Sequence, residues 1–83
     1  MAKHKRTLEA IFDLPTRANI AWRDIESLFR HHGADISEGR GSRVRVHLND
    51  EMAVFHRPHP QPETGRLTVN DVREFLTNAG IEP

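Results

Sequence analysis

Residues 43–48 constrain this chain more than any other stretch, because apolar and basic side chains alternate strictly along them. The apolar members are Val44, Val46 and Leu48, and the basic members are Arg43, Arg45 and His47. Successive side chains of a strand point to opposite faces of a sheet, so the pattern predicts a strand with one face toward a core and one cationic face. We expect a partner strand over residues 52–57, which completes a β-hairpin.

The turn of this hairpin decides which side chains lie opposite one another. Asn49 and Asp50 are the expected two-residue turn, since both residue types tolerate positive φ. The pairs are then Val44 with Phe55, Val46 with Ala53, Arg43 with His56 and Arg45 with Val54. A three-residue turn would instead place Arg57 opposite Arg43, and the sequence leaves that register open.

Two helices are expected before the hairpin, from the spacing of their apolar residues. Residues 7–14 form the first, with Thr7 as its cap and Pro15 at its end. Residues 22–32 form the second and longer one, which Gly33 closes because glycine readily adopts the conformation that ends a helix.

The second helix has a polar face opposite its apolar stripe. Glu26 and Arg30 lie on that face in the favourable acid-before-base order. After the hairpin, residues 57–62 form a proline-rich loop, since proline lacks the donor that a central strand needs. Residues 68–71 have the form of a capping box that opens a third helix, and Gly80 ends it. Its expected buried stripe consists of Val69, Val72, Phe75, Leu76 and Ala79.

A short strand over residues 34–38 precedes the hairpin, and Gly39-Arg40-Gly41 form the turn between them. The order of elements is therefore α-α-β-β-β-α. Its natural solution is an α+β fold, in which a three-stranded antiparallel sheet has helices on one face and an open face on the other. The 83 residues make one domain.

Composition excludes several classes of protein. With 36% hydrophobic and 29% charged residues, the chain is a globular protein rather than a disordered one. It has no cysteine for a disulfide or a thiolate metal site. No apolar run approaches the roughly 18 residues that span a bilayer. We expect a cytoplasmic protein with no membrane partner.

The six histidines suggest a metal site, but their spacing argues against one. His31 and His32 are neighbours on a helix, so their side chains diverge by about 100°. His56 and His59 form a better pair, yet prolines stiffen their segment and no third ligand has a fitting spacing. The chain also lacks a phosphate-binding glycine loop and a serine nucleophile elbow. We therefore expect neither a metal nor a small-molecule cofactor.

Basic side chains gather on the hairpin although the net charge of the chain is zero. Residues 40–60 contain four arginines and three histidines against two acids, and the acids lie at the expected hairpin tip. A solvated strand face accounts for such a pattern by itself. The pattern also fits a phosphate-binding surface, where histidine takes the proton of a ribose 2′-hydroxyl and arginine stabilises the phosphate charge. With Phe55 facing inward, contacts to phosphate and groove shape would dominate over base stacking.

The order and spacing of several short motifs resemble those of the HicA family of toxins from bacterial toxin–antitoxin pairs. These motifs are His31-His32-Gly33-Ala34 at the end of a helix, Gly41-Ser42 before the second strand, His59-Pro60 after the third, and Asn78-Ala79-Gly80-Ile81 at the end of the last helix. They lie within residues 22–81, the expected core, with residues 1–21 as a helical extension outside the usual family pattern.

The resemblance implies a fold similar to a double-stranded-RNA-binding domain and cleavage of messenger RNA without a metal. It also implies a HicB-type antitoxin as the protein partner. On this basis, the residues expected to bind RNA are Arg40, Ser42, Arg45, Arg57 and His59.

One position departs from the family pattern. The family motif is Gly-Ser-His, on whose histidine cleavage depends, and Arg43 takes the third place here. Arginine stays protonated and cannot act as a general base. Either His47 or His56 serves as the base while Arg43 holds the phosphate, or the chain binds RNA or a partner without cleavage. His56 is the better candidate, because the expected register places it beside Arg43. A third alternative is a structural subunit, which a large exposed apolar patch would indicate.

Overall fold

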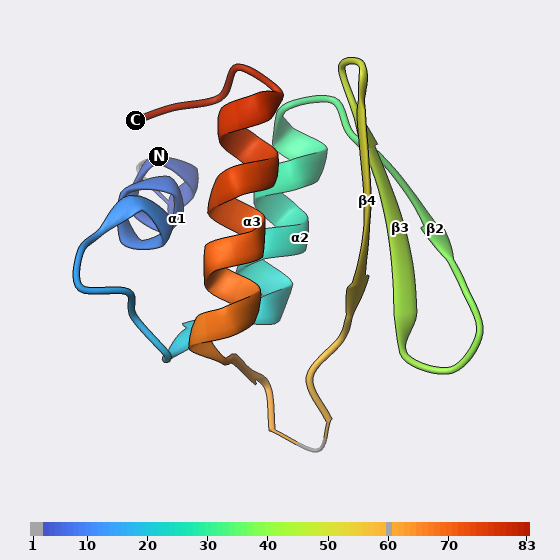
Figure 1. The fold of residues 1–83 in the computed structure, drawn as a ribbon, viewed down its shortest axis with the longest axis horizontal. Coiled ribbons are helices and arrows are strands. Elements are labelled where there is room, and N and C mark those ends of the chain that lie inside the picture. The colour runs from blue at the N-terminus through green and yellow to red at the C-terminus, as the bar shows by residue number, and fades with distance from the viewer. Residues whose placement is uncertain (1–2, 60) are drawn as a thin grey trace.

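The computed structural model describes residues 3–59 and 61–83 and shows helices on one side of a small sheet (Figure 1). Its elements are α1 (Lys3–Phe12), β1 (Ile20–Ala21), α2 (Trp22–His31), β2 (Asp35–Glu38), β3 (Arg43–Leu48), β4 (Glu51–His56), β5 (Glu63–Thr64) and α3 (Arg66–Asn78). The predicted α+β class, the three-stranded antiparallel sheet and the order α-α-β-β-β-α are confirmed. The structure also contains two strands beyond this predicted order, β1 and β5, which pair with each other. No helix in the described part of the chain is long and apolar enough to cross a membrane.

The larger sheet has the strand order β2-β3-β4, and the predicted register of its hairpin is confirmed. Arg43 lies opposite His56, so the three-residue turn is not formed. Asn49 adopts a left-handed backbone conformation with φ 57°, as the predicted turn requires. Its side-chain amide donates to the Ala79 carbonyl over 2.6 Å, which ties the hairpin tip to the end of α3.

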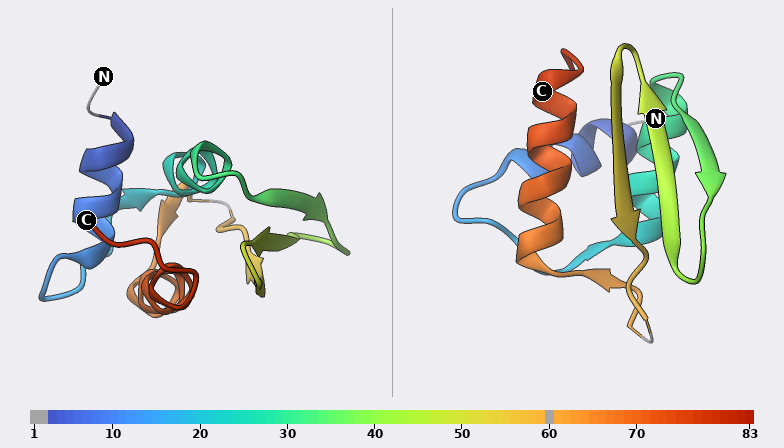
Figure 2. Two further views of the ribbon diagram at one scale, coloured as in Figure 1. Left: turned by 90° about the horizontal axis from the view of Figure 1, so that it is seen from above. Right: turned by 45° about the vertical axis from the view of Figure 1, so that its right-hand side comes forward.

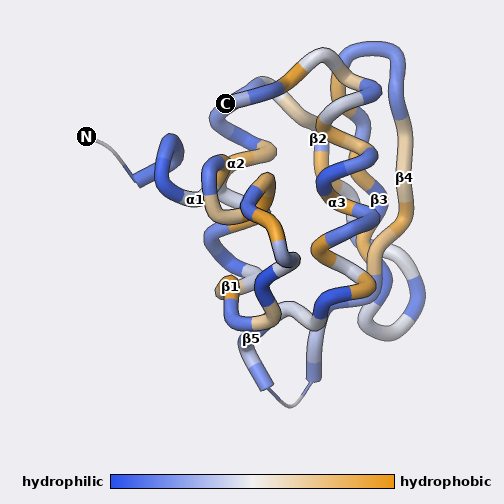
Figure 3. The backbone as a smooth tube through the Cα atoms, turned by 60° about the vertical axis from the view of Figure 1, so that its left-hand side comes forward, coloured by the Kyte–Doolittle hydropathy of each residue, from blue (hydrophilic) through white to orange (hydrophobic). Residues whose placement is uncertain are grey.

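One core lies between the sheet and the helices α2 and α3, which cover the same face of the sheet (Figure 2). Hydrophobic and hydrophilic residues alternate along α3 (Figure 3). Phe29 of α2 is fully buried, with its ring centroid 5.8 Å from that of Phe55 and 5.6 Å from that of Phe75. The predicted stripe of α3 is buried at Val69, Val72, Phe75, Leu76 and Ala79. The opposite face of the sheet is open, so its side chains are accessible to a ligand.

The first helix packs on the side of α2 and α3 that faces away from the sheet (Figure 2). Leu8 and Ile11 of α1 are buried there. Lys3 forms an ion pair with Asp24 of α2 at 3.4 Å. The guanidinium of Arg73 in α3 donates to the Ile11 carbonyl over 2.8 Å. α1 thus forms a third layer that is joined to both of the other helices.

The start of α1 differs from the prediction. The helix begins at Lys3, so Thr7 lies inside it, and the Thr7 hydroxyl donates to the Lys3 carbonyl instead of capping the helix. The helix ends at Phe12, before the position that Pro15 suggested. Lysine and arginine favour helices but contribute no apolar stripe, so spacing alone could not indicate the first turn.

The start of α3 also differs from the prediction. The helix begins at Arg66, after Gly65, so the expected capping box at residues 68–71 falls within the helix. Gly65 has an extended conformation with φ −71° and ψ 164°. The chain reaches Gly65 directly from β5, whose pairing with β1 fixes it in extended form. This tertiary contact, and not the local capping signal, decides where the helix starts.

Three histidines meet where α1 crosses α2. The ring of His4 stacks on that of His31 with centroids 4.3 Å apart, and the His31 centroid lies 5.2 Å from that of His32. His4 Nε2 shares a hydrogen bond of 3.0 Å with the Ser27 hydroxyl. Loss of hydration is the largest cause that lowers the pKa of both His4 and His32, and the nearby charge of His31 lowers it further. The folded chain therefore favours their neutral forms.

We predict that the free energy of unfolding falls as the pH is lowered from about 7.5 to about 5.5. Unfolded histidines take up protons near pH 6.5, whereas His4 and His32 in the folded chain resist protonation, so acid favours the unfolded state. Urea unfolding at several pH values measures this slope. His4→Gln should flatten it, whereas His47→Gln, which changes an exposed histidine of β3, should not. Equal slopes in the wild type and His4→Gln would contradict the prediction.

Candidate functional site

A shallow hollow of about 470 Å³ lies where the turn between β2 and β3 meets the chain that leaves β4. We call it the basic hollow, and its lining consists of Arg40, Ser42, Arg43, His56, Arg57 and His59. These are six of the eight residues that the sequence indicates for a site. Three are arginines, two are histidines, and no carboxylate of the described residues lines the hollow. The electrostatics therefore favour an anion.

The turn over residues 39–42 forms one wall of the basic hollow. The amide of Gly39 donates to the Arg43 carbonyl over 2.9 Å, and the amide of Arg43 donates to the Arg40 carbonyl over 3.1 Å. Gly41 adopts φ +61°, in the left-handed region that residues with a side chain resist. Glycine at this position thus lets the turn close tightly and present its polar residues to the hollow.

Arg43 and His56 face each other across β3 and β4, as the predicted register requires. The guanidinium Nε of Arg43 donates to Nε2 of His56 over 3.1 Å. An imidazole nitrogen accepts a hydrogen bond only through a lone pair, so this contact requires Nε2 of His56 to carry no proton. Both side chains are exposed. The hollow therefore holds a permanent cation and a potential base side by side.

Arg45 and His47 lie outside the basic hollow, farther along the open face of the sheet. Strand pairing places Arg45 beside Val54 and His47 beside Met52. Met52 is 55% exposed and Val54 is 52% exposed, so this face is basic along β3 and apolar along β4. His47 is four positions from Arg43, or roughly 13 Å along an extended strand. Of the two candidate bases, only His56 lies beside Arg43.

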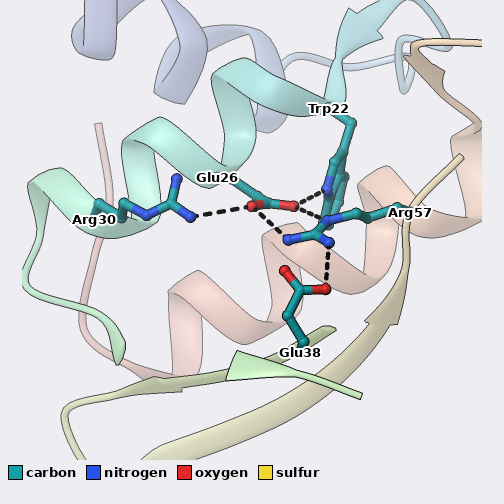
Figure 4. A network of polar contacts seen from close by, with 5 residues as sticks. All are labelled: Trp22, Glu26, Arg30, Glu38 and Arg57. Carbon is teal, nitrogen blue, oxygen red and sulfur yellow. Dashed lines mark hydrogen bonds and ion pairs between the residues drawn. The ribbon is translucent and has the colours of Figure 1, made fainter. Parts of the chain in front are cut away.

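Arg57 follows β4 directly, and its guanidinium points toward α2 (Figure 4). It donates to both carboxylate oxygens of Glu26, over 2.7 and 3.2 Å, and to Glu38 over 2.8 Å. The Trp22 indole and the Arg30 guanidinium also donate to Glu26. We call these five residues the clamp. Each of the three guanidinium nitrogens of Arg57 is engaged within it.

The clamp corrects one sequence prediction. Glu26 is paired with Arg30 at 3.4 Å as expected, but it is only 6% exposed, because the chain that leaves β4 covers it. Burial opposes the ionisation of Glu26, yet hydrogen bonds from Arg57 and Trp22 lower its pKa below the usual value. Hydrogen bonds to Glu26 and Glu38 raise the pKa of Arg57. Both partners thus stay charged near neutral pH, as a fixed ion pair.

Sequence reasoning missed the part that Glu26 and Glu38 play at the site. A local signal exists for Glu26, because Trp22 lies four residues before it on the same face of a helix. Glu38 has no such signal. It meets Arg57 only because β2 pairs with β3 and β3 pairs with β4. The expectation that Arg57 binds RNA stays a prediction, to which the structure adds that its guanidinium is already paired.

Residues 22–81 match the family described as HicA toxin of bacterial toxin-antitoxin. The chain belongs to the HicA toxin family. No curated protein and no solved structure gave a match. The match to the HicA family begins at the first residue of α2 and extends past α3, so it includes every residue of the basic hollow and leaves α1 outside. Of the motifs that suggest the family, only Pro60 lies outside the described residues.

We predict that Gly41→Ala destabilises this HicA toxin by about 1–2 kcal/mol, the usual cost of a left-handed backbone for a residue with a side chain. Apart from Gly41 and its two chain neighbours, no atom of the described residues lies within 4 Å of the position that a Cβ would take, so the backbone at φ +61° and not a clash sets the cost. Asparagine tolerates this conformation better, so Gly41→Asn should lose less. Urea unfolding of both variants measures the difference, and equal losses would show that the backbone is not the cause.

Proposed function

We propose that this HicA toxin acts by cleaving messenger RNA, and that the basic hollow binds the scissile phosphate. The observation that supports this most is the contact of Arg43 with His56 in a hollow lined by basic side chains. Cleavage of RNA needs a base for the ribose 2′-hydroxyl and a cation for the charge that grows on the phosphate. Arg43 and His56 supply one of each. Membership in a toxin family is consistent with an activity of this kind.

The contact between the two side chains also suggests how RNA starts the reaction. In the free protein, Arg43 donates to Nε2 of His56 and so occupies the lone pair of the base. A phosphate accepts a stronger, charge-assisted hydrogen bond from a guanidinium than a neutral imidazole does. RNA therefore draws Arg43 to the phosphate and frees Nε2 of His56 to accept a proton.

His56 then takes the proton of the 2′-hydroxyl beside the scissile phosphate. The 2′-oxygen forms a bond to phosphorus, the bond from phosphorus to the 5′-oxygen breaks, and solvent protonates the leaving oxygen. The products are a 2′,3′-cyclic phosphate and a 5′-hydroxyl. Arg43 stabilises the negative charge that develops on the phosphate oxygens in the transition state.

Other polar residues extend the proposed RNA surface. Arg40, Ser42 and His59 line the basic hollow around the reacting pair, as does Arg57, whose guanidinium is paired with Glu26 and Glu38. Arg45 continues the basic track along β3 on the open face of the sheet. His47 remains the second candidate for the base, but its position at the far end of β3 favours a contact to RNA outside the reacting centre.

We propose a HicB-type antitoxin as the protein partner and the cytoplasm, where messenger RNA is translated, as the place of action. The family supports the first, because it consists of toxins from toxin–antitoxin pairs. We also propose one domain, in which residues 1–21 extend a core of residues 22–81. The packing of α1 against α2 and α3 supports this arrangement.

A second candidate is a binding module of the same fold that no longer cuts RNA. One observation favours it: Arg43 stands where the resemblance leads us to expect histidine, and arginine cannot act as a base. Such a protein would still bind RNA or an antitoxin through the basic hollow. A structural subunit has less support, because only two of the large exposed apolar side chains among the described residues, Met52 and Val54, share a strand face. Leu14 follows α1 and Leu67 is in the first turn of α3.

We predict that expression of the wild-type protein arrests bacterial growth and that His56→Ala relieves the arrest. The purified variant should cleave RNA at least roughly 100-fold more slowly, since a general base typically contributes at least that factor. His47→Ala, which changes a residue outside the basic hollow, should slow cleavage far less than His56→Ala does. Gel assays of RNA in the presence of EDTA measure all three proteins. Wild-type protein that leaves RNA intact would contradict the catalytic proposal and favour the binding module.

We predict that Arg43→Ala and Arg45→Ala weaken binding to 2′-O-methyl RNA, which cannot be cleaved because it has no free 2′-hydroxyl. Each variant should also reduce the magnitude of the slope of log affinity against log salt by about 0.7 to 0.9, the value of one phosphate contact. Lys5→Ala removes the same charge from α1, on the far side of the molecule, and should change neither quantity. Fluorescence anisotropy at several salt concentrations measures the slopes. A loss of equal size in Lys5→Ala would show that net charge, not this surface, governs binding.

A further inference from the structure

Arg57 contacts both ends of the turn over residues 39–42. Glu38, the last residue of β2, stands just before the turn and accepts a hydrogen bond from Nη1 of Arg57 over 2.8 Å. At the other end, the backbone amide of Arg57 donates to the Ser42 carbonyl over 2.8 Å. One residue therefore spans the turn from end to end. The position of Arg57 consequently decides where the turn lies.

Glu26 fixes the position of Arg57. Its carboxylate is buried on α2 and accepts two hydrogen bonds from the guanidinium, so the direction as well as the distance is set (Figure 4). The Trp22 indole donates to one oxygen of the same carboxylate and holds it in place. Because a buried carboxylate without its cation is strongly unfavourable, the pair stays closed. The helix α2 is thus the support on which the turn is held.

Arg57 is poorly placed to bind a phosphate itself. Its three guanidinium nitrogens all donate to carboxylates, and two carboxylates face this one cation. The charge of Arg57 is therefore cancelled locally. Arg43, in contrast, is exposed and has an imidazole, not a carboxylate, as its partner. The attraction of the basic hollow for an anion comes from its other arginines.

We propose that Glu26 and Arg57 are positioning residues for RNA, which hold the turn over residues 39–42 so that its polar side chains and Arg43 converge on one phosphate. This inference rests on the proposed function, because it states how that site is set. It also predicts an effect that is opposite to simple electrostatics. Removal of an acid near a phosphate site normally strengthens the binding of RNA, whereas removal of Glu26 should weaken it.

The first test compares Glu26→Gln with the wild type in binding of 2′-O-methyl RNA and in cleavage of unmodified RNA. The variant keeps the size of the side chain and an oxygen for Trp22, but loses the charge that holds Arg57. We expect binding to weaken roughly 5- to 10-fold, as for residues coupled in one network. We expect kcat to fall roughly 10- to 100-fold, as for a small misplacement of a reacting group.

Two further acids give a matched comparison. Glu38→Gln removes the charge of a side chain that is 70% exposed and makes a single contact to Arg57, so it should act in the same direction with less risk to the fold. Asp35→Asn removes the same charge from an exposed residue of the same strand, outside the clamp. It should leave binding unchanged or make it slightly tighter. Comparison of these two variants separates the effect of holding Arg57 in position from the effect of removing one negative charge.

Variants of Arg57 distinguish a positioning residue from a phosphate ligand. Arg57→Gln should weaken binding but leave the slope of log affinity against log salt as in the wild type. Loss of a phosphate ligand would instead reduce the slope by about 0.7 to 0.9. Arg57→Lys restores the charge but not the two-pronged contact to Glu26, so it should recover little of the binding.

Amide hydrogen exchange checks the geometry without RNA. The Arg57 amide, which donates to Ser42, should exchange faster in Glu26→Gln and Glu38→Gln than in the wild type. If Glu26→Gln does not fold in thermal unfolding, Glu38→Gln decides the question. If the wild type binds RNA and both acid variants bind it equally well, this inference alone is overturned. A smaller slope of log affinity against log salt in Arg57→Gln also overturns it alone. Wild-type protein without affinity for RNA overturns the proposed function, and the inference with it.

Discussion

The ion pair between the buried Glu26 and the half-buried Arg57 joins the helical layer to the sheet at the point where the basic hollow begins. Apolar packing around Phe29 holds the two layers together, but it sets no direction for the chain that leaves β4. The carboxylate on α2 supplies that direction, because two parallel hydrogen bonds allow only one orientation of a guanidinium. The positions of Glu38 and Ser42 depend in turn on Arg57, which donates a hydrogen bond to each of them. The hollow therefore depends on α2 as much as on the strands that carry its side chains.

Local periodicity predicts most of this fold, and contacts between distant residues account for what it misses. Alternation over residues 43–48 indicates β3, and a turn at Asn49-Asp50 indicates the register that brings His56 beside Arg43. Neither β1 nor β5 can be found in this way, because strands of two residues have no period and form only when they meet. The start of α3 is misplaced for the same reason, since the pairing of β5 overrides a plausible cap.

For the candidate site, the sequence indicates which residues come together better than it indicates their electrostatic state. The hairpin register already implies that most of the basic residues converge, and six of the eight candidates do line the basic hollow. Arg57 is expected to bind RNA on the strength of its charge, yet its partners Glu26 and Glu38 are 31 and 19 residues away in the chain. Only the folded chain shows that they neutralise it. A count of charges in a sequence window therefore overstates the charge that a surface offers to a phosphate.

Arg43 departs from the Gly-Ser-His motif of the family, but the folded chain still places an imidazole next to this position. Directly opposite residues of antiparallel strands have Cβ atoms about 4.5–5.5 Å apart. An imidazole at position 56 thus reaches the space beside a side chain at position 43, and the 3.1 Å hydrogen bond between Arg43 and His56 shows that reach. In a hairpin, a histidine and an arginine at opposite positions can therefore swap strands and still lie side by side. That exchange depends on register, because a slip of one residue would turn His56 toward the core.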